Sequence, residues 1–155
     1  MTMSNWWKYL SIVLITYSLI AGLTGEVPRL AILNETIRNL YFHVTMWFTM
    51  IALFLYALVQ SFRFLSTGNL QYDLKAGESV HVALLFGLLG ILTGAFWAKF
   101  TWGDWWTNDV KLNGAAISVL AYLAYVILRG SMDDRMKRAR FAAVYNIFAF
   151  AMMLT

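Results

Sequence analysis

The sequence contains no cysteine among its 155 residues. This absence excludes disulfides, thiolate metal sites, iron–sulfur clusters and thiol nucleophiles. Proline occurs once and low-complexity runs are missing, which argues against flexible linkers and disordered arms. Charged residues are also scarce, because they make up 13% of the chain against roughly 25% in a soluble domain.

Apolar residues are correspondingly abundant, at 61% of the chain with a mean hydropathy of +0.63. Such a chain cannot cover itself with polar groups in water, so the sequence predicts an integral membrane protein. Its length suits a single membrane domain over residues 1–155. The cations behind the net charge of +4 lie in short loops, whereas nucleic-acid binding needs them on one water-facing surface. We therefore expect contact with membrane lipid and no nucleic acid.

Five apolar runs predict an all-α, polytopic bundle of about five transmembrane helices, since about 20 residues cross a ~30 Å hydrocarbon core. The first run has Lys8 near its start, but a clear small-x-small cleavage site is lacking, which favours an anchor helix over a signal peptide. The predicted helices cover residues 6–25, 40–62, 80–98, 113–128 and 141–155.

Lysine and arginine counts near the helix ends predict the orientation, because cytoplasmic loops carry the excess of cations. One side receives eight and the other receives four, so the N-terminus should be cytoplasmic. The loops at 25–39 and 99–112 should then face outward. The eight are Lys8, Arg63, Lys75, Arg129, Arg135, Lys137, Arg138 and Arg140, and the four are Arg29, Arg38, Lys99 and Lys111.

A tryptophan-rich loop at 97–112 is the most informative stretch, because four of the seven tryptophans lie between Trp97 and Trp106. Tryptophan is common at membrane boundaries as an anchor. If the segment is helical or nearly so, however, Trp102, Trp105, Trp106 and Asp109 share one face. A plate of indole rings favours a flat, apolar partner, since stacking contributes roughly 0.5–1.5 kcal/mol per ring pair.

Residues around this loop indicate which flat partner to expect. Lys99 and Lys111 are placed to pair with carboxylates on its rim. His43, at the outward end of the second apolar run, has the same predicted depth, and neutral imidazole is a good ligand for haem iron. A capping or packing role for His43 is the alternative. A porphyrin with two propionates fits the whole set, so we expect haem.

His81 invites a haem held by two histidines, but the predicted topology excludes it. His81 begins the third apolar run at the cytoplasmic side, whereas His43 begins the second at the outer side. Helix rise and core thickness put the two roughly 25 Å apart in depth. One iron cannot bind both, and we interpret His81 as a boundary residue.

Three glycines, Gly87, Gly90 and Gly94, fall on nearly one side of the third apolar run. Small residues at this spacing let membrane helices approach closely. The spacing therefore predicts helix packing. A flat ligand lying in the groove that they form is the alternative.

The run from Trp102 to Leu112, with sequence WGDWWTNDVKL, resembles the tryptophan-rich signature of bacterial haem-handling proteins. It is similar in particular to the haem exporter protein C family, the C component of the cytochrome c maturation system. The segment Tyr41–Val44 resembles the outer-loop histidine segment of that family. Helix order and the position of the signature also match, so the resemblance covers essentially the whole chain.

The resemblance implies a protein that holds b-type, non-covalent haem at the outer surface of the bacterial cytoplasmic (inner) membrane. It implies His43 as an axial ligand of the haem iron, with Trp102, Trp105, Trp106 and Asp109 as the binding platform. The implied partners are ATP-binding-cassette (ABC) transporter subunits, a small accessory membrane subunit and a membrane-tethered haem chaperone, to which the haem passes. Such a protein handles haem for transport and is not an independent enzyme.

The sequence departs from the family pattern at several positions. Thr45 stands where the family commonly has proline, Asn108 where it often has an aromatic residue, and Lys111 where it has arginine. The family also carries a second axial histidine and a sixth helix beyond the fifth. We therefore expect a truncated sequence or a shortened relative, in which Met46 or a partner's side chain would have to supply any second ligand.

Three other functions compete with haem handling. A non-haem transporter would need polar or ionisable groups inside its helices, and the predicted spans contain no acid. A structural subunit of a respiratory complex would use the tryptophans only as anchors. A membrane enzyme would need a catalytic set of side chains, and the sequence shows no such set.

Overall fold

The computed structural model describes residues 5–154, and these residues contain five α-helices, one short 3-10 helix and no strand. The predicted all-α class is therefore confirmed. The elements are α1 (Trp6–Thr24), η1 (Asn34–Arg38), α2 (Asn39–Thr67), α3 (Leu70–Trp102), α4 (Val110–Gly130) and α5 (Arg135–Met153).

Four of the described helical segments are long and apolar enough to cross a membrane, namely Trp6–Thr24, Asn34–Thr67, Leu70–Trp102 and Val110–Gly130. The chain is thus a multi-pass membrane protein. Helix α5 is not among the four, because its first two turns carry Arg135, Lys137, Arg138 and Arg140. The last residue of the fifth predicted run, Thr155, lies outside the described residues.

The helices extend beyond the apolar runs because local caps, and not hydropathy, end them. Gly68 adopts a left-handed conformation with φ of 70° and closes α2. The side chain of Asn69 then accepts a hydrogen bond from the Gln71 amide and starts α3. With 33 residues, α3 is about 50 Å long, so it outreaches the hydrocarbon core.

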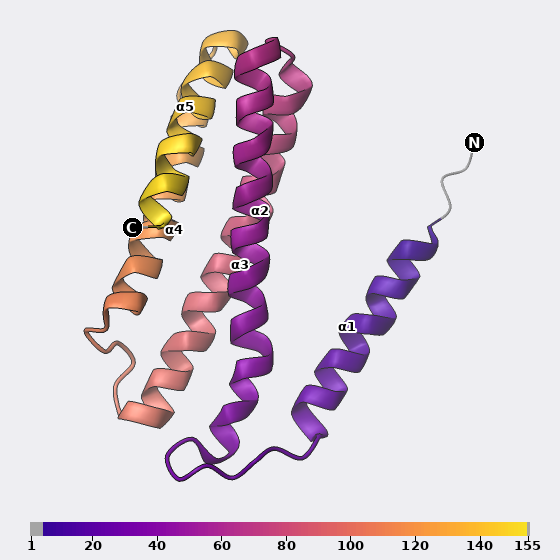
Figure 1. Ribbon diagram of the computed structural model, residues 1–155, viewed down its shortest axis with the longest axis vertical. Helices are drawn as coiled ribbons and strands as arrows, with labels where there is room; N and C mark the ends of the chain where they lie inside the picture. Colours follow the sequence, from indigo (N-terminus) through magenta and orange to yellow (C-terminus); the bar gives the residue numbers. More distant parts are fainter. Residues whose placement is uncertain (1–4, 155) are drawn as a thin grey trace.

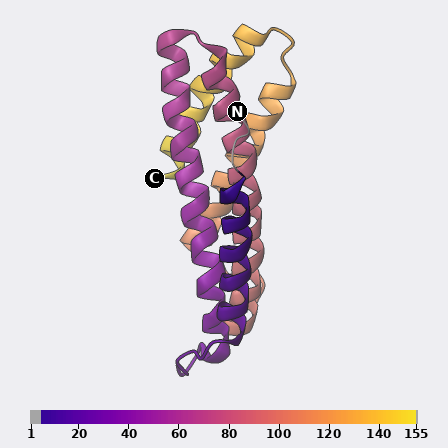
Figure 2. The ribbon, with the colours of Figure 1, turned by 90° about the vertical axis from the view of Figure 1, so that its right-hand side faces the viewer.

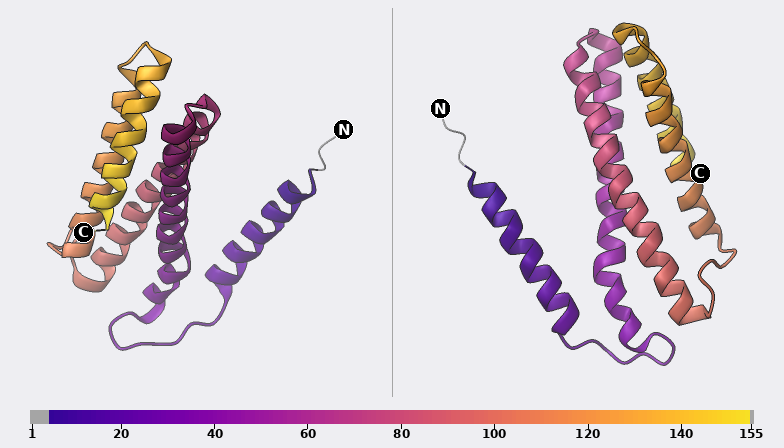
Figure 3. Two further views of the ribbon diagram at one scale, coloured as in Figure 1. Left: turned by 45° about the horizontal axis from the view of Figure 1, so that its top comes forward. Right: turned by 180° about the vertical axis from the view of Figure 1, so that it is seen from behind.

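Helices α2 to α5 pack as a bundle, while α1 stands apart from it (Figures 1 and 3). The one buried residue of α1 is Gly22, where an added Cβ would lie 2.9 Å from the Phe42 ring. Arg38 holds the end of α1, because its Nη1 donates to the carbonyls of Gly22 and Gly25. The first helix is therefore tied to the bundle mainly at one end.

The turn between α2 and α3, at 68–69, and the turn between α4 and α5, at 131–134, lie at one end of the molecule (Figure 1). The connections at 25–38 and 103–109 lie at the other, and the 25–38 connection forms its tip (Figure 2). At the bundle centre the rings of Phe54 and Tyr122 stack 3.5 Å apart with an interplanar angle of 10°. This contact joins α2 to α4.

A buried ion pair links α3 to α4 near the 131–134 turn. Asp73 is 4% exposed and accepts hydrogen bonds from both terminal nitrogens of Arg129, of which the Nη2–Oδ2 contact measures 3.0 Å. Gly77 makes room for the guanidinium, since an added Cβ would lie 3.2 Å from Arg129 Nη2. Asp73 lies outside the apolar run at 80–98, so the expectation of acid-free spans did not cover it.

Candidate functional site

His43 lies in the second turn of α2 and contacts side chains of both α2 and α3. Its Nδ1 lies 3.1 Å from the hydroxyl of Thr93, and its Nε2 accepts a hydrogen bond of 3.1 Å from the indole N–H of Trp47. The rings of Trp47 and Trp97 meet the imidazole edge-on, with centroids at 6.0 and 5.8 Å. The imidazole is half-buried and fixed on several sides.

The three glycines of α3 receive the side chains of α2. A Cβ added at Gly94 would lie 2.8 Å from His43 Cε1, and one added at Gly90 would lie 2.9 Å from the indole of Trp47. At Gly87 the nearest atom is the sulfur of Met50, also at 2.9 Å. The packing interpretation of these glycines is correct. Side chains of α2 occupy the groove at Gly87 and Gly90 and leave no room there for a flat ligand, whereas Gly94 also lines the cavity beside His43.

A cavity of about 630 Å³ opens beside His43 between the bundle helices. This volume lies in the range of small-molecule and cofactor sites, roughly 300–1,000 Å³. Predicted site residues in its lining are His43, Trp97, Trp102, Asp109 and Lys111. The other lining residues are Trp47, Met50, Ile51, Gly94, Ala98, Thr107, Val110, Leu112, Gly114, Ala115, Ser118, Met153 and Leu154.

The chemistry of this lining suits a flat, apolar, acidic ligand. Indole rings and aliphatic side chains supply apolar surface, the imidazole supplies a nitrogen donor, and Lys111 supplies a cation that is exposed at the cavity. Among residues 5–154, no group of three or more His, Asp or Glu side chains is placed to hold a bare metal ion.

Residues 103–109 of the tryptophan-rich loop are not helical, so the predicted single plate of indole rings is wrong. Helix α3 ends at Trp102 because Gly103 adopts a left-handed conformation with φ of 89°. Trp102 faces the cavity, whereas Trp105 packs edge-on against Phe96 at 5.1 Å. Trp106 donates instead to Asn113 Oδ1 at 3.1 Å. These three indoles are 67%, 52% and 45% exposed, which leaves each with surface for a ligand or partner.

Two charged residues predicted for the site, Asp109 and Lys99, form hydrogen bonds with backbone groups. Asp109 is the N-cap of α4, and its carboxylate accepts from the amides of Lys111 and Leu112. Lys99 donates to the carbonyl of Gly103 at 2.7 Å and does not line the cavity. Asp109 and Lys99 thus bind backbone groups at the ends of α4 and α3. The prediction that Asp109 shares a face with the tryptophans did not take helix capping into account.

Two residues that contact the imidazole, Trp47 and Thr93, were not predicted from the sequence. Trp47 could have been found, because positions i and i+4 of a helix share a face. Thr93 had no such signal, since it comes from another helix. Met46, the suggested second ligand, is absent from the cavity lining, where Met50 and Met153 supply the thioethers.

His81 lies within α3 and is exposed, far from this cavity. Gly94, which contacts His43, is thirteen residues further along the same helix. At 1.5 Å per residue this separation is about 20 Å. The two histidines therefore cannot share one iron.

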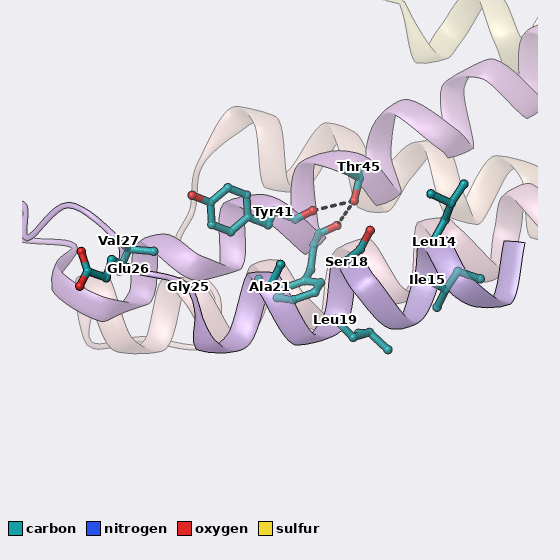
Figure 4. A pocket seen from close by; sticks show the side chains of 12 residues that line it. Leu14, Ile15, Ser18, Leu19, Ala21, Gly25, Glu26, Val27, Tyr41 and Thr45 are labelled. Carbon is teal, nitrogen blue, oxygen red and sulfur yellow. Dashed lines mark hydrogen bonds between the residues drawn. The ribbon is translucent and has the colours of Figure 1, made fainter. Parts of the chain in front are cut away.

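A second cavity, of about 640 Å³, lies between α1 and α2 (Figure 4). Thr45 turns back onto its own helix there and donates to the carbonyls of Tyr41 and Phe42. The lining contains no histidine, tryptophan or lysine and consists of Leu14, Ile15, Ser18, Leu19, Ala21, Gly22, Gly25, Glu26, Val27, Tyr41, Phe42 and Thr45. This lining supplies no imidazole nitrogen that could ligate iron, so the His43 cavity is the better candidate for a haem site.

Comparison with known proteins decides the family. Residues 1–153 match the family described as "Heme exporter protein C". The chain belongs to the haem exporter protein C family. "Heme exporter protein C" of Rhodobacter capsulatus is 31% identical over 107 residues, which cover 69% of this chain and 44% of the relative. The Escherichia coli K12 protein of the same name is 24% identical over 139 residues, or 90% of this chain and 56% of the relative.

A second group of relatives also belongs to cytochrome c biogenesis. "Cytochrome c biogenesis protein CcsA" of Prochlorococcus marinus is 36% identical over 78 residues, or 50% of this chain and 25% of the relative. The chain thus spans about half the length, or less, of these curated relatives. Membership of the haem exporter protein C family makes haem the ligand to test in the His43 cavity.

Proposed function

We propose that the protein binds haem non-covalently in the His43 cavity and transfers it to a haem chaperone at the outer surface of the bacterial cytoplasmic membrane. The carrying observation is that His43 opens onto a cavity also lined by Trp97 and Trp102. When bound, haem would supply an iron that an imidazole nitrogen can ligate. His43 is the one imidazole in the lining.

The remaining lining residues have distinct roles in this proposal. Trp97 and Trp102 provide aromatic contact to the porphyrin, and Lys111 pairs with a propionate through a charge-assisted hydrogen bond. Lysine lacks the planar fork of arginine, so the pairing is not bidentate. Asp109 acts by starting α4 at the cavity, which sets the position of Lys111.

The outer tryptophans and the partners complete the proposal. Trp105 and Trp106 are half-exposed outside the cavity, where they are placed to meet the haem edge or the receiving chaperone. ABC transporter subunits and a small accessory membrane subunit are the proposed assembly partners, by analogy with the family. The protein itself acts as a haem-handling component and not as an enzyme.

Visible spectroscopy of the detergent-purified protein tests this function. Cells supplied with haem should yield protein with a Soret band, and His43→Ala should abolish or shift that band. His81→Ala is the matched control and should leave the band unchanged, because His81 lies outside the cavity. The proposal fails if the unmodified protein lacks the band or if His43→Ala keeps it. A purely structural subunit predicts the first of these results.

A further inference from the structure

The hydrogen bonds of His43 determine which ring nitrogen carries the proton. The indole of Trp47 has only an N–H, so it can donate and cannot accept. His43 Nε2, at 3.1 Å from that N–H, must therefore be unprotonated. The neutral ring then carries its proton on Nδ1, which lies 3.1 Å from Thr93 Oγ1.

Thr93 is free to accept this proton because its own hydroxyl proton is already engaged. Its Oγ1 donates back to the carbonyls of Leu89, at 2.8 Å, and Gly90, at 3.1 Å, on the same helix. The oxygen lone pairs thus remain available to the Nδ1–H of His43. Histidine ligands of metals commonly donate their second nitrogen to such a partner, which fixes the tautomer and the ring orientation.

Close packing holds the two rings in this arrangement. The absence of a side chain at Gly90 lets the indole of Trp47 lie on the backbone of α3, and Gly94 does the same for the imidazole. Both rings also line the cavity of about 630 Å³. The Trp47–His43 hydrogen bond therefore lies at the wall where a ligand of His43 would enter.

We propose that Trp47 is a latch on His43: its indole N–H occupies the Nε2 lone pair that binds the haem iron, and it must swing away before ligation. Thr93 keeps the ring in the Nδ1–H form, so Nε2 is the ligating atom. This inference rests on the proposed function and concerns the regulation of the same site. Trp47 is a positioning residue, because it acts through His43.

The latch predicts how the haem-free protein reacts with diethylpyrocarbonate, which attacks an unprotonated imidazole nitrogen. Peptide mapping compares the modification rate of His43 with that of exposed His81 in the same sample. Trp47→Phe should raise the His43/His81 rate ratio several-fold, since the lone pair is released. Trp97→Phe is the matched control, because it removes an indole that touches the same imidazole without a hydrogen bond to it, and it should leave the ratio near the unmodified value.

Nitrogen NMR of the unmodified, histidine-labelled protein tests the tautomer without any packing change. His43 should show a protonated Nδ1 and an unprotonated Nε2, with His81→Gln used for assignment. The latch is overturned if the tautomer is reversed. It is also overturned if Trp47→Phe leaves the rate ratio unchanged or if Trp97→Phe raises the ratio equally.

Haem titration separates failure of the latch from failure of the proposed function. Trp47→Phe should bind haem roughly 2- to 13-fold more tightly than the unmodified protein, the factor that one net hydrogen bond contributes. Equal affinities with a His43-dependent Soret band would overturn the latch alone. No Soret band in either protein would overturn the haem function, while the diethylpyrocarbonate and NMR results would still report on the Trp47–His43 contact.

Discussion

Two charged residues near the cavity bind backbone groups at helix ends. Asp109 was expected on a binding platform, yet its carboxylate accepts from two amides at the start of α4. Lys99 similarly donates to the carbonyl of Gly103 at the end of α3. Substitutions of such residues change the fold around a site and are easily mistaken for loss of a ligand contact.

Asp109→Ala should lower the free energy of unfolding by about 1 kcal/mol, because the N-cap of α4 is lost. Asp109→Asn should retain most of that stability, since asparagine caps nearly as well as aspartate. Thermal unfolding in detergent, followed by circular dichroism, measures both changes. Equal destabilisation by the two substitutions would contradict a capping role and would favour a role for the carboxylate charge.

At the scale of secondary structure, α2 and α3 pack closely where glycines of α3 leave room for large side chains of α2. Glycines along α3 take up His43, Trp47 and Met50 of α2, and each added Cβ would approach within 2.9 Å of a side-chain atom. Gly114 of α4 provides the contrast, since nothing lies within 4 Å of an added Cβ there. The two kinds of glycine predict opposite responses to substitution.

Gly90→Ala should destabilise the protein by roughly 1–3 kcal/mol, because the new methyl group overlaps the indole of Trp47. Gly114→Ala should be neutral or stabilising by up to about 1 kcal/mol, since alanine favours the helix and meets no neighbour. Unfolding midpoints of the two variants in the same detergent provide the comparison. If Gly90→Ala left the unfolding midpoint unchanged, the indole of Trp47 would have moved aside at no cost in stability, which would contradict tight packing of α2 on α3.

Much of this architecture could be predicted from the sequence, because apolar runs of membrane length report helices directly. The helix ends could not, since hydropathy stops at the membrane boundary while α3 continues through Asp73 and Lys75. The apolar runs also did not indicate that Gly103 would end α3 in a left-handed conformation. The prediction that the indole rings share one face assumed that the helix continues past this residue. His43, Trp97 and Trp102 were predicted from the sequence as site residues and line the candidate cavity, whereas Thr93 required knowledge of which face of α3 packs on α2.

At the scale of the whole molecule, the ends of the bundle differ in composition. The 103–109 connection carries tryptophans beside the candidate cavity, and the 131–134 turn leads into the arginine-rich start of α5. Cation counts predict that the arginine-rich end lies in the cytoplasm. The proposed transfer of haem at the outer surface depends on this orientation.

Cysteine labelling tests the orientation without background, because the chain contains no cysteine of its own. Asp104→Cys and Asp133→Cys place one exposed thiol at each end. A membrane-impermeant maleimide should label position 104 in intact cells, with the outer membrane permeabilised, and position 133 only after the inner membrane is broken. The reverse pattern would put the tryptophan-rich loop in the cytoplasm and contradict transfer at the outer surface.

The most direct test of the account is chemical rescue of His43→Gly, which leaves room for a free imidazole beside the cavity. We predict that the purified variant lacks the Soret band of the unmodified protein and that added imidazole restores it, since the free ring takes the place of the missing ligand. A variant that keeps the original Soret band without imidazole would contradict ligation by His43.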